Sequence, residues 1–166
     1  MSEDLAEGKS TSHKAELEIN WEYYGDFVRD VEHKHKLKIE NEGDEIKKPG
    51  IYKLISRDRS ELYVGQGKNL HDRLREYRNA GFNPDNKKEK TNRRIQGWML
   101  RLINENKGPI KILVCTKAPY LCQDGEKLRL DLGGEFSGKY NRELIEHIEI
   151  IIKTFKNVLF SKGVSH

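Results

Sequence analysis

Residues 50–65 constrain the fold most strongly, because they have the pattern of two short strands joined by a tight polar turn. The run is GIYKLISRDRSELYVG, in which apolar and polar residues alternate on both sides of the turn. Successive side chains of a strand point to opposite faces of a sheet, so this alternation predicts an antiparallel hairpin. With a symmetric turn, Leu54 lies opposite Tyr63, and Tyr52 lies opposite Gly65. Both tyrosines then share one face of the hairpin as diagonal neighbours.

A short amphipathic helix is predicted directly after the hairpin. Asn69 is a good N-cap, and the buried stripe of the helix has the spacing i, i+4, i+7 in Leu70, Leu74 and Tyr77. Arg73 lies beside this stripe, and an arginine on an inward-facing surface needs a partner. A phosphate above the tyrosines would match the guanidinium geometry. The alternative is that Arg73 extends along the surface to a carboxylate.

This combination resembles the signature of the GIY-YIG nuclease superfamily. Its parts are Gly50-Ile51-Tyr52, then Tyr63-Val64-Gly65, then Arg73 ten residues after Tyr63, with Val64 in place of the commoner isoleucine. The resemblance covers roughly residues 49 to 161. It implies an α+β fold with a small central antiparallel three-stranded β-sheet flanked by α-helices. The alternating run from Ile110 to Lys117 is the expected third strand.

The resemblance also implies an activity, namely hydrolysis of DNA phosphodiester bonds with a divalent cation, Mg²⁺ or Mn²⁺. In the family, Tyr52 or Tyr63 would act as the general base or position the attacking water. Arg73 would bind the scissile phosphate, and one helical glutamate would bind the metal. Tyr77 stands where many members have histidine, which makes it a third candidate for the proton step.

The metal-binding glutamate is expected on the last predicted helix, Arg142 to about Lys156. Glu149 fits the family pattern best, because three isoleucines and a lysine follow it, and helical phase places it at the rim of the buried face. Glu146 is the alternative. Ser161 stands where the family often has asparagine. A purely structural interpretation also stays open, in which these carboxylates, together with Glu143, are solvated helix charges.

The charge of the chain is distributed unevenly. Residues 1–48 hold 8 basic and 13 acidic side chains, whereas residues 49–166 hold 23 basic and 14 acidic side chains. The segment with the motif is therefore the basic one, as binding to a phosphate backbone requires. A basic solvated face is common, so charge alone is weak support. With double-stranded DNA as the expected partner, we predict contacts from the basic residues near the motif, Lys68, Arg75, Arg78, Arg93 and Arg94.

The N-terminal part lies outside the resemblance. We expect a disordered tail over residues 1–14, a helical arm and connector over residues 15–48, and the nuclease domain over residues 49–166. The apolar residues between Glu16 and Val31 fall mostly at helical spacing, which predicts an extra N-terminal helix. This helix would pack on the body or support a homodimer, because a palindromic DNA site needs two subunits.

The remaining segments give weaker indications of fold and function. Residues 118–140 contain four glycines and are predicted to be irregular. The two cysteines, Cys115 and Cys122, have no metal-binding spacing, and Cys115 is expected to be a buried free thiol in a reducing compartment. No apolar run is long enough to span a bilayer, so we expect a cytoplasmic protein without membrane contact.

The leading functional hypothesis is a type II restriction endonuclease, because the catalytic module would fill most of the chain. A phage or mobile-element endonuclease, of the degradative or homing type, is the second hypothesis. A non-catalytic DNA-binding protein on the same scaffold is an alternative from another class, since a fold does not determine function.

Overall fold

The fold is known from a computed structural model, which describes residues 12, 14–78, 87–134 and 137–161, without the side chains of 137 and 154–161. The tail predicted over residues 1–14 lies almost entirely outside the described residues.

The main sheet has five strands in the order β3-β2-β6-β4-β5, and every neighbouring pair is antiparallel. The strands are β2 (Glu22–Arg29), β3 (Leu37–Glu40), β4 (Gly50–Ile55), β5 (Leu62–Gly67) and β6 (Ile110–Cys115). The predicted α+β class is confirmed. The three predicted strands are adjacent in the order β6-β4-β5, but β2 and β3 extend the sheet beyond the three strands expected.

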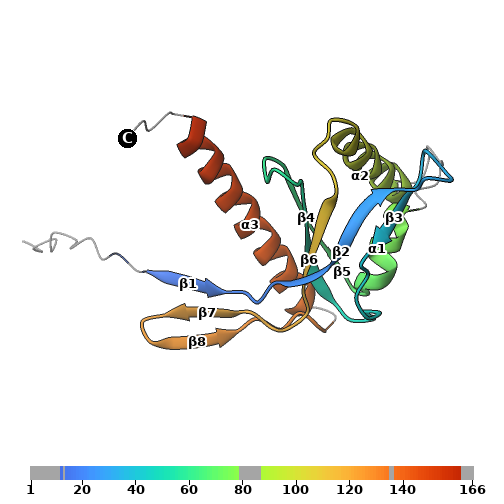
Figure 1. The fold of residues 1–166 in the computed structure, drawn as a ribbon. Helices are drawn as coiled ribbons and strands as arrows, with labels where there is room; N and C mark the ends of the chain where they lie inside the picture. Colours follow the sequence, from blue (N-terminus) through green and yellow to red (C-terminus); the bar gives the residue numbers. More distant parts are fainter. Residues whose placement is uncertain (1–11, 13, 79–86, 135–136, 162–166) are drawn as a thin grey trace, which may run out of the picture.

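Helices cover both faces of this sheet (Figure 1). They are α1 (Leu70–Arg78), α2 (Lys87–Asn104) and α3 (Ser137–Ser161). On one face Tyr52 and Leu54 pack in a core with α1 and α2, because alternate strand residues point that way. On the opposite face Ile51 packs with Ile145 of α3. Since β5 is an edge strand, the space beside it is reached from both layers.

The predicted N-terminal helix is wrong, because the structure has strands β1 (Ala15–Glu18) and β2 in that region. The cause is a β-bulge, since the register of β2 on β6 shifts between Tyr23 and Gly25. A bulge inserts one extra residue, so Tyr24 and Phe27 both enter the core although they are three positions apart. That spacing imitates a helix. The domain boundary near residue 49 stays a prediction, although β2 and β3 share the sheet of β4.

A second, smaller sheet has the strand order β1-β7-β8. It contains β7 (Tyr120–Gln123) and β8 (Glu126–Arg129), so the predicted irregular stretch over residues 118–140 is partly wrong. The hairpin turns at Asp124 and Gly125, both of which have positive φ. Asp-Gly suits such a tight hairpin turn, and this signal was present in the sequence.

The last helix begins earlier than the sequence predicts, at Ser137 instead of Arg142. Helix α2 begins before Thr91, whose hydroxyl donates to the carbonyl of Lys87 at 3.0 Å. Within the described part of the chain, no helix combines the length and the apolar character that crossing a membrane needs.

Candidate active site

The β4–β5 hairpin has the predicted register, with Tyr52 opposite Gly65 and Leu54 opposite Tyr63. Tyr52 is fully buried, and its ring centroid lies 6.3 Å from that of Tyr63. The two tyrosines are therefore diagonal neighbours on one face, as alternation along the strands requires. This part of the site follows directly from local sequence.

Two glycines of β5 let other side chains approach the strand closely. A Cβ at Gly65 would overlap the hydroxyl and ring of Tyr52. A Cβ at Gly67 would lie 3.1 Å from Cβ of Arg73. A larger residue at either position would push Tyr52 or Arg73 away from the edge strand. The glycines thus set the distance between this strand and the functional side chains.

Helix α1 brings Tyr77 and Arg73 to the hairpin. Asn69 caps it as predicted, because its Oδ1 accepts the amide N–H of Asp72 at 3.2 Å. Leu70, Leu74 and Tyr77 are buried as the helical stripe predicts. The hydroxyls of Tyr52 and Tyr77 are hydrogen-bonded to each other. Their rings meet edge-on with centroids 6.1 Å apart, so strand and helix are joined at this point.

Arg73 lies over the tyrosines and is held by α2. Its guanidinium carbon lies 4.8 Å from the ring centroid of Tyr77. Its Nη1 donates to Oε2 of Glu76 at 2.8 Å and to Oδ1 of Asn92 at 2.7 Å. The carboxylate partner considered from the sequence is therefore present, and the arginine also faces the tyrosine cluster. Sequence reasoning missed Asn92, which no local pattern connects to Arg73.

Burial controls the protonation of this cluster. It raises the pKa of Tyr52, although Arg73 acts in the opposite direction. It raises the pKa of Tyr77 as well, and the neighbouring Tyr52 adds to this effect. Burial opposes the charge of Arg73, but Tyr52 and Tyr77 outweigh it and raise the pKa of the guanidinium. The buried tyrosines are therefore neutral hydroxyl donors at neutral pH, beside a permanently charged arginine.

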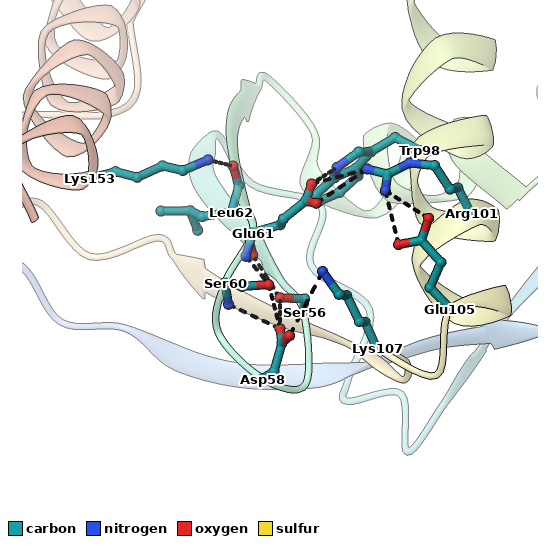
Figure 2. Close-up of polar contacts among 10 residues, drawn as sticks. All are labelled: Ser56, Asp58, Ser60, Glu61, Leu62, Trp98, Arg101, Glu105, Lys107 and Lys153. Atoms are coloured by element: carbon teal, nitrogen blue, oxygen red, sulfur yellow. Dashed lines mark hydrogen bonds and ion pairs between the residues drawn. The ribbon is translucent and has the colours of Figure 1, made fainter. Parts of the chain in front are cut away.

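Tyr63 is the least buried of the three tyrosines and is supported from the side by α2. Its ring centroid lies 6.4 Å from that of Trp98. The indole Nε1 of Trp98 donates to Oε2 of Glu61 at 2.7 Å, and Arg101 donates to the same carboxylate (Figure 2). Glu61 thereby orients the ring against which Tyr63 packs. No local sequence pattern connects Glu61 with Trp98 or marks either as a support of the site.

Glu146 reaches the edge of β5 from α3. Its Oε2 accepts a hydrogen bond from Nε2 of Gln66 at 3.3 Å. Gln66 in turn accepts from Nε of Arg142 at 3.0 Å, which fixes the amide. Burial raises the pKa of Glu146, although the Gln66 amide, His147 and, as the smallest effect, Arg73 lower it. The carboxylate is thus poorly compensated, and Arg73 is near enough to act on it.

Glu149 is in a different environment. It is 9% exposed, and its Oε2 pairs with Nζ of Lys53 at 2.6 Å. That ammonium also lies 4.2 Å from the ring centroid of Trp21. Lys53 alternates with Tyr52 along β4, so this ion pair lies on the opposite face of the sheet from the tyrosines. Gln66, the partner of Glu146, alternates with Gly65 and so faces α3 as well, but it lies on the edge strand, and Arg73 acts on the pKa of Glu146.

The predicted DNA contacts lie at several places on the surface. Lys68, Arg93 and Arg94 are exposed. Arg75 and Arg78 line a hollow together with Glu42 and Glu45, which offset their charge. Within the described residues, no three His, Cys, Asp or Glu side chains are grouped to hold a metal ion. A cation at Glu146 would therefore need water or substrate oxygens as its other ligands, as hard cations accept.

Comparison with known families agrees with this geometry. The family model of the GIY-YIG catalytic domain matches residues 48–117, which include the three tyrosines and Arg73. The match ends before α3, so it does not include Glu146 or Glu149. No curated protein and no solved structure matches the chain significantly. Residues 48–117 therefore form a GIY-YIG catalytic domain, the domain that characterises the GIY-YIG nuclease superfamily.

Proposed function

We propose that this protein is a divalent-metal-dependent DNA endonuclease, and specifically a type II restriction endonuclease. The observation that carries the proposal is the position of Arg73. Its guanidinium lies over the Tyr77 ring, next to the hydrogen-bonded hydroxyls of Tyr77 and Tyr52, at the glycine-lined end of an edge strand. A phosphate placed there would meet the permanent positive charge of Arg73, which the neutral tyrosines hold in position.

The three tyrosines divide the work according to burial. Tyr52 and Tyr77 are fully buried and hydrogen-bonded to each other, so they serve to position Arg73 rather than to contact the phosphate. Tyr63 is half-buried and can contact the attacking water. In the reaction, water forms a bond to phosphorus and passes a proton through the Tyr63 hydroxyl to solvent, while the bond to the 3′ oxygen breaks and that oxygen takes up a proton from solvent. Arg73 offsets the negative charge that develops on the phosphate.

We propose Glu146 as the metal ligand in preference to Glu149. The pKa of Glu146 is raised by burial, and a bound cation would relieve the cost of that buried charge. Glu149 already has a cation, Lys53, at 2.6 Å. Glu146 would hold Mg²⁺ or Mn²⁺, and the cation would supply positive charge that stabilises the leaving oxygen.

The restriction assignment rests on the elements added around the catalytic domain. Strands β1 to β3 and the β7–β8 hairpin lie outside residues 48–117, which the family model matches. Recognition of a DNA sequence would fall to such additions. A homodimer would suit a palindromic site, but the helix that was expected to support it is replaced by strands. A phage or mobile-element endonuclease would use the same chemistry.

The experiment is incubation of plasmid and phage DNA with the purified protein, in Mg²⁺, in Mn²⁺ and in EDTA. Discrete metal-dependent fragments would support a restriction enzyme, and a smear would favour a degradative nuclease. Glu146→Gln is expected to abolish cleavage. Glu149→Gln is expected to cleave DNA at temperatures at which that variant is folded. Salt-sensitive binding without cleavage under every condition would instead establish a DNA-binding protein on this scaffold.

A further inference from the structure

A groove lies on the face of the main sheet that α1 and α2 do not cover. It has a volume of about 1080 Å³ and runs between the second half of α3 and strands β4 and β6. Its wall includes the β4–β5 turn, where Asp58 accepts hydrogen bonds from Ser60 and Ser56 (Figure 2). These bonds hold the pKa of Asp58 at about 2. The turn is therefore an ordered wall of the groove.

The rim of the groove is basic. Lysines and arginines contribute five of its lining residues, against the two carboxylates of Asp26 and Glu149. Three of the cations, Arg57, Arg59 and Lys111, are exposed. Among the residues that the structure describes, none of these three has an ion-pair partner. Cations that are exposed and unpaired are available to a ligand with negative charge.

The floor of the groove is apolar, with side chains from both layers. Ile55 and Leu62 come from the hairpin, Leu113 comes from β6, and Ile152 comes from α3. Ile152 is 42% exposed, so part of this surface has no cover among the described residues. An occupant must therefore offer anionic groups to the rim and flat or apolar groups to the floor.

The groove is connected along α3 to Glu146, the proposed metal ligand. Glu146, Glu149 and Lys153 lie on successive turns of the side that faces the sheet, about 5 Å apart per turn. Nζ of Lys153 donates to the carbonyl of Leu62 at 2.7 Å, on the same strand whose Gln66 holds Glu146 (Figure 2). A DNA strand that passes Glu146 would therefore meet the groove one helical turn further along α3.

We propose that this groove binds an unpaired DNA strand next to the cut site. A duplex keeps its base faces stacked inside and would leave the apolar floor uncovered. A single strand presents backbone phosphates to Arg57, Arg59 and Lys111, and base faces to the floor. The proposal rests on the proposed function, since it takes this strand to belong to the DNA that is cleaved. It specifies the substrate as DNA with a single-stranded flank.

The test compares fluorescein-labelled duplexes that differ only in a single-stranded tail of about ten nucleotides. Binding is measured in EDTA over a range of salt concentrations, with wild type and with the double variant Arg59→Glu/Lys111→Glu. The control is Lys34→Glu/Lys36→Glu, which makes the same charge change in the loop before β3, the strand at the opposite edge of the sheet. Thermal unfolding checks that each variant is folded. If the charge-reversal variant Arg59→Glu/Lys111→Glu does not fold, Arg59→Ala/Lys111→Ala is used in its place.

The tail is expected to increase the affinity of wild type and of the control by about tenfold. The groove variant is expected to lose this gain. For tailed DNA, its slope of log K against log salt concentration is expected to fall in magnitude by about 1.4, since each of two single-strand phosphate contacts contributes about 0.7. The proposal would be overturned if the groove variant kept the gain in affinity from the tail, or if its affinity for blunt and for tailed DNA fell by the same factor. Cleavage of plasmid DNA in Mg²⁺ is measured in parallel. Cleavage without a tail effect contradicts the groove alone, whereas a tail effect without cleavage contradicts the nuclease assignment alone.

Discussion

The two carboxylates of α3 are predicted to respond in opposite ways to the same isosteric substitution. Glu149 and Lys53 form a pair whose side chains are 11% and 14% exposed, with an N–O distance of 2.6 Å. Removal of one partner from a buried pair costs about 3 to 5 kcal/mol, because the other charge stays buried without compensation. Glutamine keeps the volume and a carbonyl acceptor, and Trp21 still faces the Lys53 ammonium. We therefore expect Glu149→Gln to lower the free energy of unfolding by about 2 to 3 kcal/mol.

Glu146→Gln is predicted to stabilise the fold. Burial raises the pKa of Glu146, so the ionised carboxylate is disfavoured in the folded protein. The resulting loss of stability in wild type is present above the raised folded pKa and disappears as the pH falls below the unfolded value of about 4.3. The advantage of the glutamine variant should therefore be largest near pH 7 and vanish near pH 4.

Thermal unfolding at several pH values tests both substitutions. For a chain of this size, 1 kcal/mol shifts Tm by about 2 to 4 °C, so Glu149→Gln should lower Tm by about 4 to 12 °C. Glu146→Gln should raise Tm at pH 7 and abolish cleavage. The reasoning is refuted if Glu149→Gln unfolds like wild type, or if Glu146→Gln is destabilised at pH 7. Either result would mean that the two environments have been assigned wrongly.

Three further predictions concern the surroundings of the site. Gly65→Ala should cost about 1 to 3 kcal/mol in chemical denaturation, because its Cβ overlaps the buried Tyr52 ring; unchanged stability would contradict this close packing. Glu61→Ala should lower kcat more than it changes KM and shift tryptophan fluorescence, with rescue by Glu61→Gln, because Glu61 orients Trp98 beside Tyr63; an unaltered kcat would exclude that role. Burial raises the pKa of Cys115 to about 11, so its thiol should react with a disulfide reagent at pH 8 only after unfolding; rapid labelling of Cys115 in the native protein would show that it is accessible.

The catalytic hairpin and helix could be predicted from the sequence because their determinants are local. The register that pairs Tyr52 with Gly65 follows from alternation and a short turn, and both are read within sixteen residues. The start of α1 follows from Asn69, whose side chain caps it. Arg73 then lies on the correct side of its helix because helical phase accumulates little error over one turn.

The parts that the sequence did not determine depend on distant contacts. The bulge in β2 arises in its pairing with β6, almost ninety positions later, and it turned a strand pattern into a helix-like one. The choice between Glu146 and Glu149 depends on which face of α3 meets which edge of the sheet. Helical phase correctly predicted that Glu149 is near the buried face, but its burial is satisfied by Lys53, a residue of β4. No periodicity in α3 contains that information.

The assignment of Arg73 as the phosphate-binding residue is the central claim, and one comparison tests it most directly. DNA cleavage in Mg²⁺ is measured for wild type, Arg73→Ala, and the control Arg129→Ala, which removes an exposed arginine of β8 in the smaller sheet. Wild type and Arg129→Ala are expected to cut, while Arg73→Ala stays folded, still binds DNA and does not cut. Cleavage by folded Arg73→Ala at the rate of wild type would contradict the account.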